Sequence, residues 1–244
     1  LRSDLTEARL TGTDLSEAGV LNTLLLRTNL EQANLTGTAF SGANLTEANF
    51  RRVAGGGLSM TGVILTRADF TNAMVHNSVW SGAFVNEVNL TDAQLNGSDL
   101  RNAEFIDSRL GGASFNNASL RGADLASANI EAVSFLGADL DDVNFRFARY
   151  DDRTVWSPSF EFRTLMALGP ETIFANGFQF PNDFQMEGVN LRSAQLVGAR
   201  LTRANLRGAQ LQGAEMQSAI LNGADLSQTD LTGVSLPQAQ LAGA

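Results

Sequence analysis

The sequence predicts a solenoid, a chain that turns at regular intervals and stacks upon itself. Three regularities predict it. From Leu5 to Tyr150 every fifth residue is large and apolar, at 30 positions of which only Gly55 departs from the rule. The residue two before each of these positions is Ala, Ser, Thr or Val, except for Leu58. The residue two after it is frequently Gly or Asn. A period of five fits neither an α-helix nor a β-strand, so neither could keep this apolar set on one face.

The Gly and Asn positions predict a corner in every pentad. Gly37 and Asn117 are examples, each two residues after the large apolar residue, which we call the central residue. Gly and Asn adopt a positive φ angle at the lowest cost, as a repeated corner requires. Each pentad should therefore form one short side. Its central residue and the small residue two before it point inward, and the residue directly before the central one points outward.

Many pentads match a known signature. Ala43–Glu47 reads Ala-Asn-Leu-Thr-Glu, and Ala123–Ser127 and Ala138–Asp142 read Ala-Asp-Leu followed by two variable residues. These segments resemble the A(D/N)LXX repeat of the pentapeptide-repeat protein family, and the chain looks like a cyanobacterial member. The resemblance implies an all-β solenoid, a right-handed quadrilateral β-helix with four pentads in each coil. Successive coils would then lie about 4.8 Å apart, like neighbouring strands of a sheet.

The repeat is predicted to form two blocks. Block 1 covers residues 1–150 and block 2 covers residues 186–244, where 12 pentads follow from Met186. The second block is shifted by one residue in phase, so residues 151–185 are not merely degenerate repeat. Block 1 has a net charge of −6 and residues 191–244 a net charge of +1.

The segment 151–185 is predicted to be an ordered insert. It contains 3 of the 4 prolines and 6 of the 15 phenylalanines, an apolar content that argues against a disordered linker. A short helix is expected at about residues 160–168, with Ser159 as its N-cap and Pro170 as its stop. Tyr150–Trp156 also resembles a segment that follows the repeats in cyanobacterial members of the family.

Composition bounds other properties. The 244 residues carry a net charge of −9, and all 17 basic residues are Arg. No Cys is present, which excludes disulfides and thiolate metal sites. No apolar run approaches about 18 residues, so we expect a soluble chain without a membrane span. The compartment is not predicted: it would be the cytoplasm or, if a signal peptide was removed before Leu1, the periplasm or thylakoid lumen.

The sequence offers little to an enzyme. His76, the one histidine, falls on an outward corner, where a general base would lack a positioned partner. Gly55-Gly56-Gly57 lacks the Lys of a phosphate loop. Gly55 removes one side chain from the core and Leu58 adds a large one, so we interpret the two residues as an exchange of core volume. The carboxylates between Asp139 and Asp152 should lie on outward corners and diverge, whereas a metal ion needs several oxygen atoms that converge. We therefore expect no enzyme activity and no catalytic, cofactor-binding or metal site.

Residues twenty apart should lie directly above one another in a four-sided coil. Charges of alternating sign then form a ladder, predicted to stabilise stacking: Glu7, Arg27, Glu47, Arg67 and Glu87.

Outward apolar residues are the stronger indication of function, because large exposed apolar patches usually mark partner sites. Leu24, Ile64 and Phe84 share one side with Asn44 and Glu104, and two further residues are expected on adjoining sides. The aromatic insert adds two more. The candidate protein-contact residues are Leu24, Ile64, Met74, Val79, Phe84, Trp156 and Phe160.

The function predicted is a non-enzymatic interaction scaffold with an unidentified protein partner, without direct nucleic-acid binding. The alternative, implied by the family resemblance, is a DNA mimic that inhibits a topoisomerase such as gyrase. Mimicry needs carboxylates dense along the column. Because Arg alternates with Glu on the best ladder, it ranks second. Exposed coil edges invite pairing, so an end-to-end homodimer is a further hypothesis.

Overall fold

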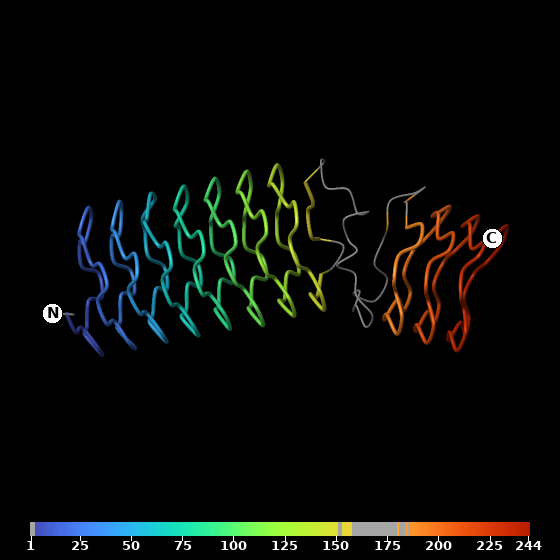
Figure 1. Cartoon of the computed structure of the whole chain (residues 1–244), viewed down its shortest axis with the longest axis horizontal. Coiled ribbons are helices and arrows are strands. Elements are labelled where there is room, and N and C mark those ends of the chain that lie inside the picture. Colours follow the sequence, from blue (N-terminus) through green and yellow to red (C-terminus); the bar gives the residue numbers. More distant parts are fainter. Residues whose placement is uncertain (1–2, 151–152, 158–179, 181–183, 185) are drawn as a thin grey trace. The chain divides into compact units, whose positions relative to one another are not determined.

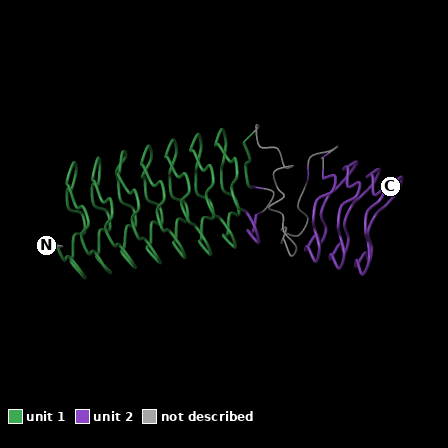
Figure 2. Ribbon diagram, viewed as in Figure 1, with its two compact units in different colours: residues 1–144, 154–160 green, residues 145–153, 161–244 purple. Residues whose placement is uncertain are grey.

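The protein divides into two compact units in a computed structural model (Figure 2). The first comprises Leu1–Asn144 and Thr154–Phe160, and the second Phe145–Arg153 and Glu161–Ala244. The structure describes residues 3–150, 153–157, 180, 184 and 186–244. Over these residues the backbone forms turns and single-residue parallel β-bridges, without helices or longer strands. The helix expected at residues 160–168 lies outside the described residues.

The first unit is a stack of coils that each contain four pentads (Figure 1). Parallel bridges join outward residues twenty apart, beginning with Asp4 and Leu24 and continuing to Asp124 and Asn144. Hydrogen bonds run on both sides of each bridge: the Leu25 amide donates to the Asn44 carbonyl at 2.8 Å, and the Asn44 amide donates to the Thr23 carbonyl at 3.0 Å. This ladder satisfies the backbone of the outward residues on every side.

The corners lie where the sequence predicts them. The second residue after a central residue has a positive φ in both units, and 24 such residues are not glycine. Arg67 is one, with φ of 60°. A short hydrogen bond closes the corner, as where the Ala43 amide donates to the Phe40 carbonyl at 2.8 Å. Left-handed backbone costs a non-glycine residue about 1–2 kcal/mol, so the stacked coils must impose this conformation.

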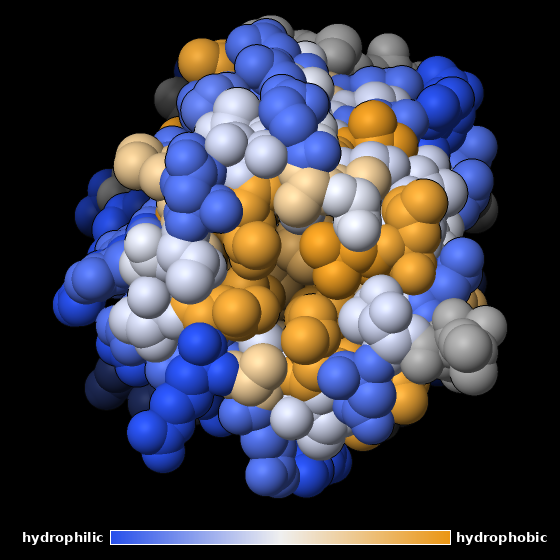
Figure 3. Space-filling view, turned by 90° about the vertical axis from the view of Figure 1, so that its left-hand side faces the viewer, coloured by the Kyte–Doolittle hydropathy of each residue, from blue (hydrophilic) through white to orange (hydrophobic). Residues whose placement is uncertain are grey.

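Central residues fill the interior of the first unit. Leu25 is 1% exposed, whereas Leu5, its equivalent in the preceding coil, is 37% exposed. Seen from the N-terminal end, apolar residues accordingly gather in the middle of the face, within a rim of polar ones (Figure 3). Aromatic rings stack between coils, with ring centroids 4.3 Å apart for Phe50 and Phe70. These contacts add to apolar burial, the main stabilising term in such a core.

The phase shift between the repeat blocks begins before residue 156. Val155 bridges Ser134, a spacing of 21 residues, whereas Asn144 still bridges Asp124 at a spacing of 20. One extra residue therefore lies between Asn144 and Val155. Trp156 then occupies a central position, and its ring stacks on Phe135 with centroids 5.5 Å apart. Within the predicted insert, residues 154–157 thus belong to the first unit.

Gly55 lies where two coils approach closely. A Cβ atom there would be 2.7 Å from the backbone carbon of Leu35 and 2.8 Å from the amide nitrogen of Thr36. Leu58 is fully buried, in keeping with the expected exchange of core volume. The Leu58 amide donates to Ser78 Oγ at 3.0 Å. A serine hydroxyl in the next coil thus takes the place of the carbonyl that usually closes a corner.

The second unit repeats the same pattern with its own ladder. Parallel bridges twenty residues apart run from Asn190–Gln210 to Ile220–Gln240. The Met186 amide donates to the Asn205 carbonyl at 2.7 Å. The central residues from Met186 to Leu221 are at most 1% exposed, so this unit has an apolar core of its own.

Candidate protein-contact surface

The first unit has four sides, each defined by its outward residues. Side A comprises Asp4, Leu24, Asn44, Ile64, Phe84, Glu104, Asp124 and Asn144. Side B comprises Arg9, Asn29, Asn49, Asp69, Asn89, Arg109 and Asn129. Side C comprises Asp14, Asn34, Ala54, Met74, Gln94, Ser114, Ser134 and Val155. Side D comprises Gly19, Ala39, Ser59, Val79, Asp99, Ser119 and Asp139. Because the chain visits the sides in this order, side A adjoins B and D and lies opposite C.

Two predicted contact residues are direct neighbours on side A. Ile64 bridges Phe84, and the two residues are 38% and 45% exposed. Leu24 lies on the same side but is half-buried, and Asn44 separates it from Ile64. The apolar patch of side A therefore consists of Ile64 and Phe84.

The other predicted contact residues are dispersed. Val79 is 39% exposed on side D, which adjoins side A. Met74 is 51% exposed but lies on side C. It does not join the patch, because residues ten apart in a four-pentad coil occupy opposite sides. Trp156 is half-buried on Phe135, and Phe160 lies outside the described residues.

Sides D and A share an uncharged surface around the apolar patch. It is formed by residues 36–46, 56–66 and 76–86, which contain no Asp, Glu, Arg or Lys. The corner between the two sides carries Gly in three successive coils, at residues 42, 62 and 82, each after a Ser or Thr, so only short side chains stand between Val79 and Phe84. This uncharged surface is unusual in a chain in which 18% of the residues are charged.

Carboxylates follow the apolar patch along side A. Phe84 bridges Glu104, which bridges Asp124. Glu104 accepts a hydrogen bond from Asn86 Nδ2 at 3.3 Å, and Asp124 accepts one from Asn144 Nδ2 at 2.9 Å. Neither carboxylate forms an ion pair with any described residue. Side A thus runs from two apolar residues to two uncompensated negative charges.

Two arginines at the corner between sides D and A are engaged by other carboxylates. Arg101 makes two bonds to the Asp99 carboxylate, at 2.8 and 2.7 Å. The guanidinium bonds lower the pKa of Asp99, and the carboxylate raises the pKa of Arg101. Arg121 contacts Asp139 at 3.3 Å and Asp141 at 2.6 Å, which raises its pKa. These contacts leave the carboxylates of side A unneutralised.

The predicted charge ladder is present at the corner between sides A and B. Arg27 contacts Glu7 at 2.7 Å. Arg67 contacts Glu87 at 2.8 Å and Glu47 at 3.9 Å. Hydrogen bonds from Arg27 to Glu7, and from Arg67 to Glu87, raise the pKa values of both guanidinium groups. Solvent screens exposed pairs of this kind, so each adds little to stability, and their alternating signs agree with the stacking of successive coils.

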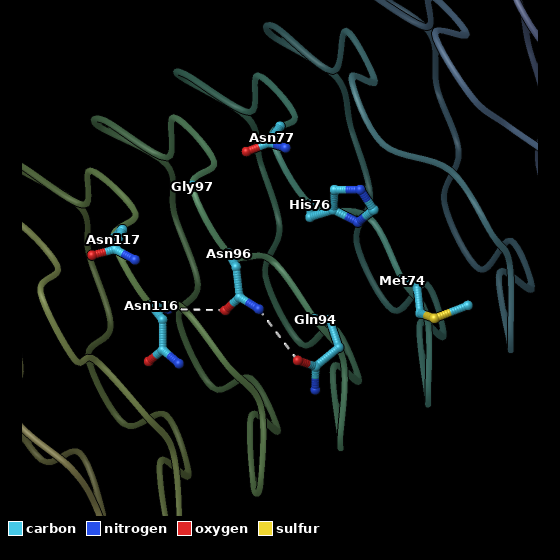
Figure 4. Close-up of a pocket in the computed structure, with 8 residues that line it drawn as sticks. All are labelled: Met74, His76, Asn77, Gln94, Asn96, Gly97, Asn116 and Asn117. Carbon is cyan, nitrogen blue, oxygen red and sulfur yellow. Dashed lines mark hydrogen bonds between the residues drawn. The ribbon is translucent and has the colours of Figure 1, made fainter.

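His76 lines a shallow hollow between sides C and D (Figure 4). The hollow is lined by Met74, His76, Asn77, Gln94, Asn96, Gly97, Asn116 and Asn117. Asn96 is fixed by its neighbours: its Oδ1 accepts from the Asn116 amide at 3.1 Å, and its Nδ2 donates to Gln94 Oε1 at 3.4 Å. The lining contains no carboxylate to orient the imidazole and no nucleophile beside it. This arrangement does not support acid–base catalysis.

The described residues lack a metal cluster and a membrane-spanning helix. They contain no group of three or more His, Cys, Asp or Glu side chains that could hold a metal ion. In the same part of the chain, no helix has the length and apolar character needed to cross a membrane.

A family model described as pentapeptide repeats matches the chain in 8 copies, over residues 22–53, 68–105, 86–122, 108–146, 185–223 and 209–244. The matched segments cover more than half of the chain. The chain belongs to the pentapeptide repeat family. The matches leave out residues 147–184, which hold nearly all of the predicted insert. No curated protein matches the chain.

Solved pentapeptide repeat structures resemble the chain at low identity. HetL from the cyanobacterium Nostoc sp. strain PCC 7120 is 25% identical, with 94% of this chain and 87% of HetL covered and a TM-score of 0.27. QnrB1, a plasmid-mediated fluoroquinolone resistance protein, is 15% identical, with 93% and 89% covered and a TM-score of 0.32. Rfr23 from the cyanobacterium Cyanothece 51142 is 20% identical, with 63% and 90% covered and a TM-score of 0.23.

Sequence reasoning missed one residue of this surface. Asp124 was not assigned to side A, although its distance of forty residues from Phe84 places it two coils further on the same ladder. Sequence alone could not show that Arg101 and Arg121 are held on side D.

Proposed function

We propose that this pentapeptide repeat protein is a non-enzymatic interaction scaffold, whose right-handed coils present side A of the first unit to a protein partner. The observation that carries the proposal is the pair Ile64 and Phe84, exposed side by side within an uncharged surface. Neighbouring outward positions on side A are polar or charged, so this pair departs from the composition that solvation alone would favour. Exposed apolar residues grouped in this way are typical of partner sites.

The rigidity of the coils supports a scaffold role. The backbone of each outward residue on side A is held by hydrogen bonds to both neighbouring coils: the Ile64 amide donates to the Ala43 carbonyl at 3.1 Å, and the Leu65 amide donates to the Phe84 carbonyl at 2.8 Å. A surface fixed before binding loses little conformational entropy on association. No catalytic role is assigned to the hollow at His76.

Affinity capture from an extract of the native cells tests this function. Wild-type protein should retain a partner that the double variant Ile64→Glu/Phe84→Glu loses, because two buried carboxylates would replace the apolar contact. Met74→Glu is the matched control, since Met74 is similarly exposed on side C. A partner retained equally by the double variant would refute side A as the contact surface.

Inhibition of gyrase by DNA mimicry is the second candidate, favoured by the unpaired carboxylates Glu104 and Asp124. The density of charge argues against it. From Ile64 to Asp124 is three coil steps, about 14 Å, over which duplex DNA carries about eight phosphates. Side A offers two outward carboxylates there. Dose-dependent inhibition of DNA supercoiling by gyrase would reverse this ranking.

End-to-end pairing of two copies remains a prediction of the sequence. Light scattering over a range of concentrations tests it. A molar mass that rises to twice that of the 26.0 kDa chain would support pairing, and a constant monomeric mass would refute it.

A further inference from the structure

We propose that the partner segment recognised by side A is a basic amphipathic α-helix, which lies along the stacking direction of the first unit. The inference rests on the proposed function and specifies its ligand. Two properties of side A carry it: the order of its outward side chains and the spacing of its coils.

The order of side chains defines the chemistry of the ligand. Ile64, Phe84, Glu104 and Asp124 succeed one another in four adjacent coils, one residue in each. The first two expose apolar surface, and the next two carry carboxylates without an ion pair among the described residues. A complementary segment needs two apolar side chains followed by two basic ones in the same sequence of positions. Such complementarity favours the correct partner and penalises an acidic one.

The spacing of the coils defines the conformation of the ligand. Three steps of about 4.8 Å separate Ile64 from Asp124, a length of about 14 Å. A helix along this line presents one side chain per turn of about 5.4 Å, and three turns span about 16 Å. An extended strand presents alternate residues about 6.6 Å apart, and three such steps span about 20 Å. The helix stays within about 2 Å of register over four contacts, and the strand does not.

The two corners that flank side A differ in the length of their side chains. At the corner toward side D, Gly62 and Gly82 have no side chains, and the residues before them, Thr61 and Ser81, have short ones. At the opposite corner, toward side B, Thr66 and Asn86 are short, and the longer Arg67 and Glu87 beside them pair with each other at 2.8 Å. Val79 extends the apolar surface beyond the glycine corner. Helices commonly bind through one apolar stripe of this kind.

A peptide library tests the proposal with the full chain. The probe is a displayed library of helical peptides of about 14 residues, varied at four positions one turn apart on one face. We expect selection to enrich two successive apolar residues followed by two Arg or Lys. A fluorescein-labelled copy of the selected peptide should then bind more weakly as salt increases, because the basic pair is attracted through screened charges.

Variants identify where the selected peptide binds. Phe84→Ser should weaken binding at least about tenfold, as expected for a central apolar contact. Glu104→Gln/Asp124→Asn should weaken it and flatten its salt dependence. Met74→Ser and Asp92→Asn are controls of matched chemistry on other parts of the unit and should leave affinity unchanged. Circular dichroism verifies that each variant folds.

Two results would overturn the proposal: no enrichment of basic residues among selected peptides, or a selected peptide that binds Phe84→Ser as tightly as wild type. Failure of the proposed function looks different. If the library yields no basic helix while capture of a native partner still depends on Ile64 and Phe84, the scaffold role survives and the helical ligand is refuted.

Discussion

Replacing Gly55 by Ala should force apart two coils that Gly55 allows to approach. The new Cβ would lie 2.7 Å from the Leu35 carbonyl carbon and 2.8 Å from the Thr36 nitrogen, whereas ordinary contacts begin at 3.4 Å. Both atoms belong to the backbone and cannot rotate away. A core forced to accept an extra methyl group typically loses about 1–3 kcal/mol, which we expect for Gly55→Ala.

Gly19→Ala is the matched control. Gly19 also lacks a positive φ, and a Cβ there would have no atom within 4 Å. Its replacement should be neutral or should stabilise by about 0.4–1 kcal/mol through the unfolded state. Urea denaturation followed by circular dichroism measures both changes. Because long repeat arrays lose cooperativity, hydrogen exchange of the Gly37 amide, which donates to the Gly56 carbonyl at 3.0 Å, provides a local readout. Gly55→Ala with wild-type stability and exchange would refute the close approach.

Three further predictions concern the first unit. Ser78→Ala should cost about 1–3 kcal/mol in urea denaturation, because it removes the acceptor of the buried Leu58 amide; unchanged stability would contradict that role. Phe135→Ala should cost about 3–5 kcal/mol and shift Trp156 fluorescence to longer wavelength, since the two rings stack; an unshifted emission would argue against the stack. Asp99→Asn should destabilise by at most about 1 kcal/mol above pH 3.8, because Arg101 lowers the folded-state pKa of Asp99. This difference should vanish as pH falls through the lowered pKa, and a loss that persists below it would contradict the pairing.

The repeating part of the fold could be predicted from sequence because one local rule recurs in every pentad. The period placed the positive φ angles at the second residue after each central residue, where they occur. It also placed Arg67 between Glu47 and Glu87. The five-residue period is sufficient for the first inference. The twenty-residue length of a coil is sufficient for the second, because each residue contacts its equivalents in the adjacent coils.

Features that depend on departures from the rule were harder to predict. The phase shift was expected after Tyr150, and the bridges confine the extra residue to the stretch between Asn144 and Val155. Charged residues such as Arg67 at positive φ do not follow from intrinsic preference, since stacking overrides it. The hydroxyl of Ser78 replaces a backbone acceptor, which a pattern of apolar residues cannot reveal.

The twenty-residue length of each coil made the contact surface partly predictable. Ile64 and Phe84 share a ladder, so their adjacency follows from the period. The assignment of Met74 to the same region failed, because its distance of ten residues from Phe84 places it two pentads away, on side C. Burial of Leu24 could not be derived from its outward position alone.

Photo-crosslinking in the native cells tests the central claim, that side A is the protein-contact surface. A photoreactive phenylalanine analogue is placed at Phe84 in one protein and at Met74 in another, because both positions are exposed and they lie on opposite sides. Irradiation should yield a discrete protein adduct from position 84 and none from position 74. Equal adducts from the two positions, or adducts from position 74 alone, would contradict the account.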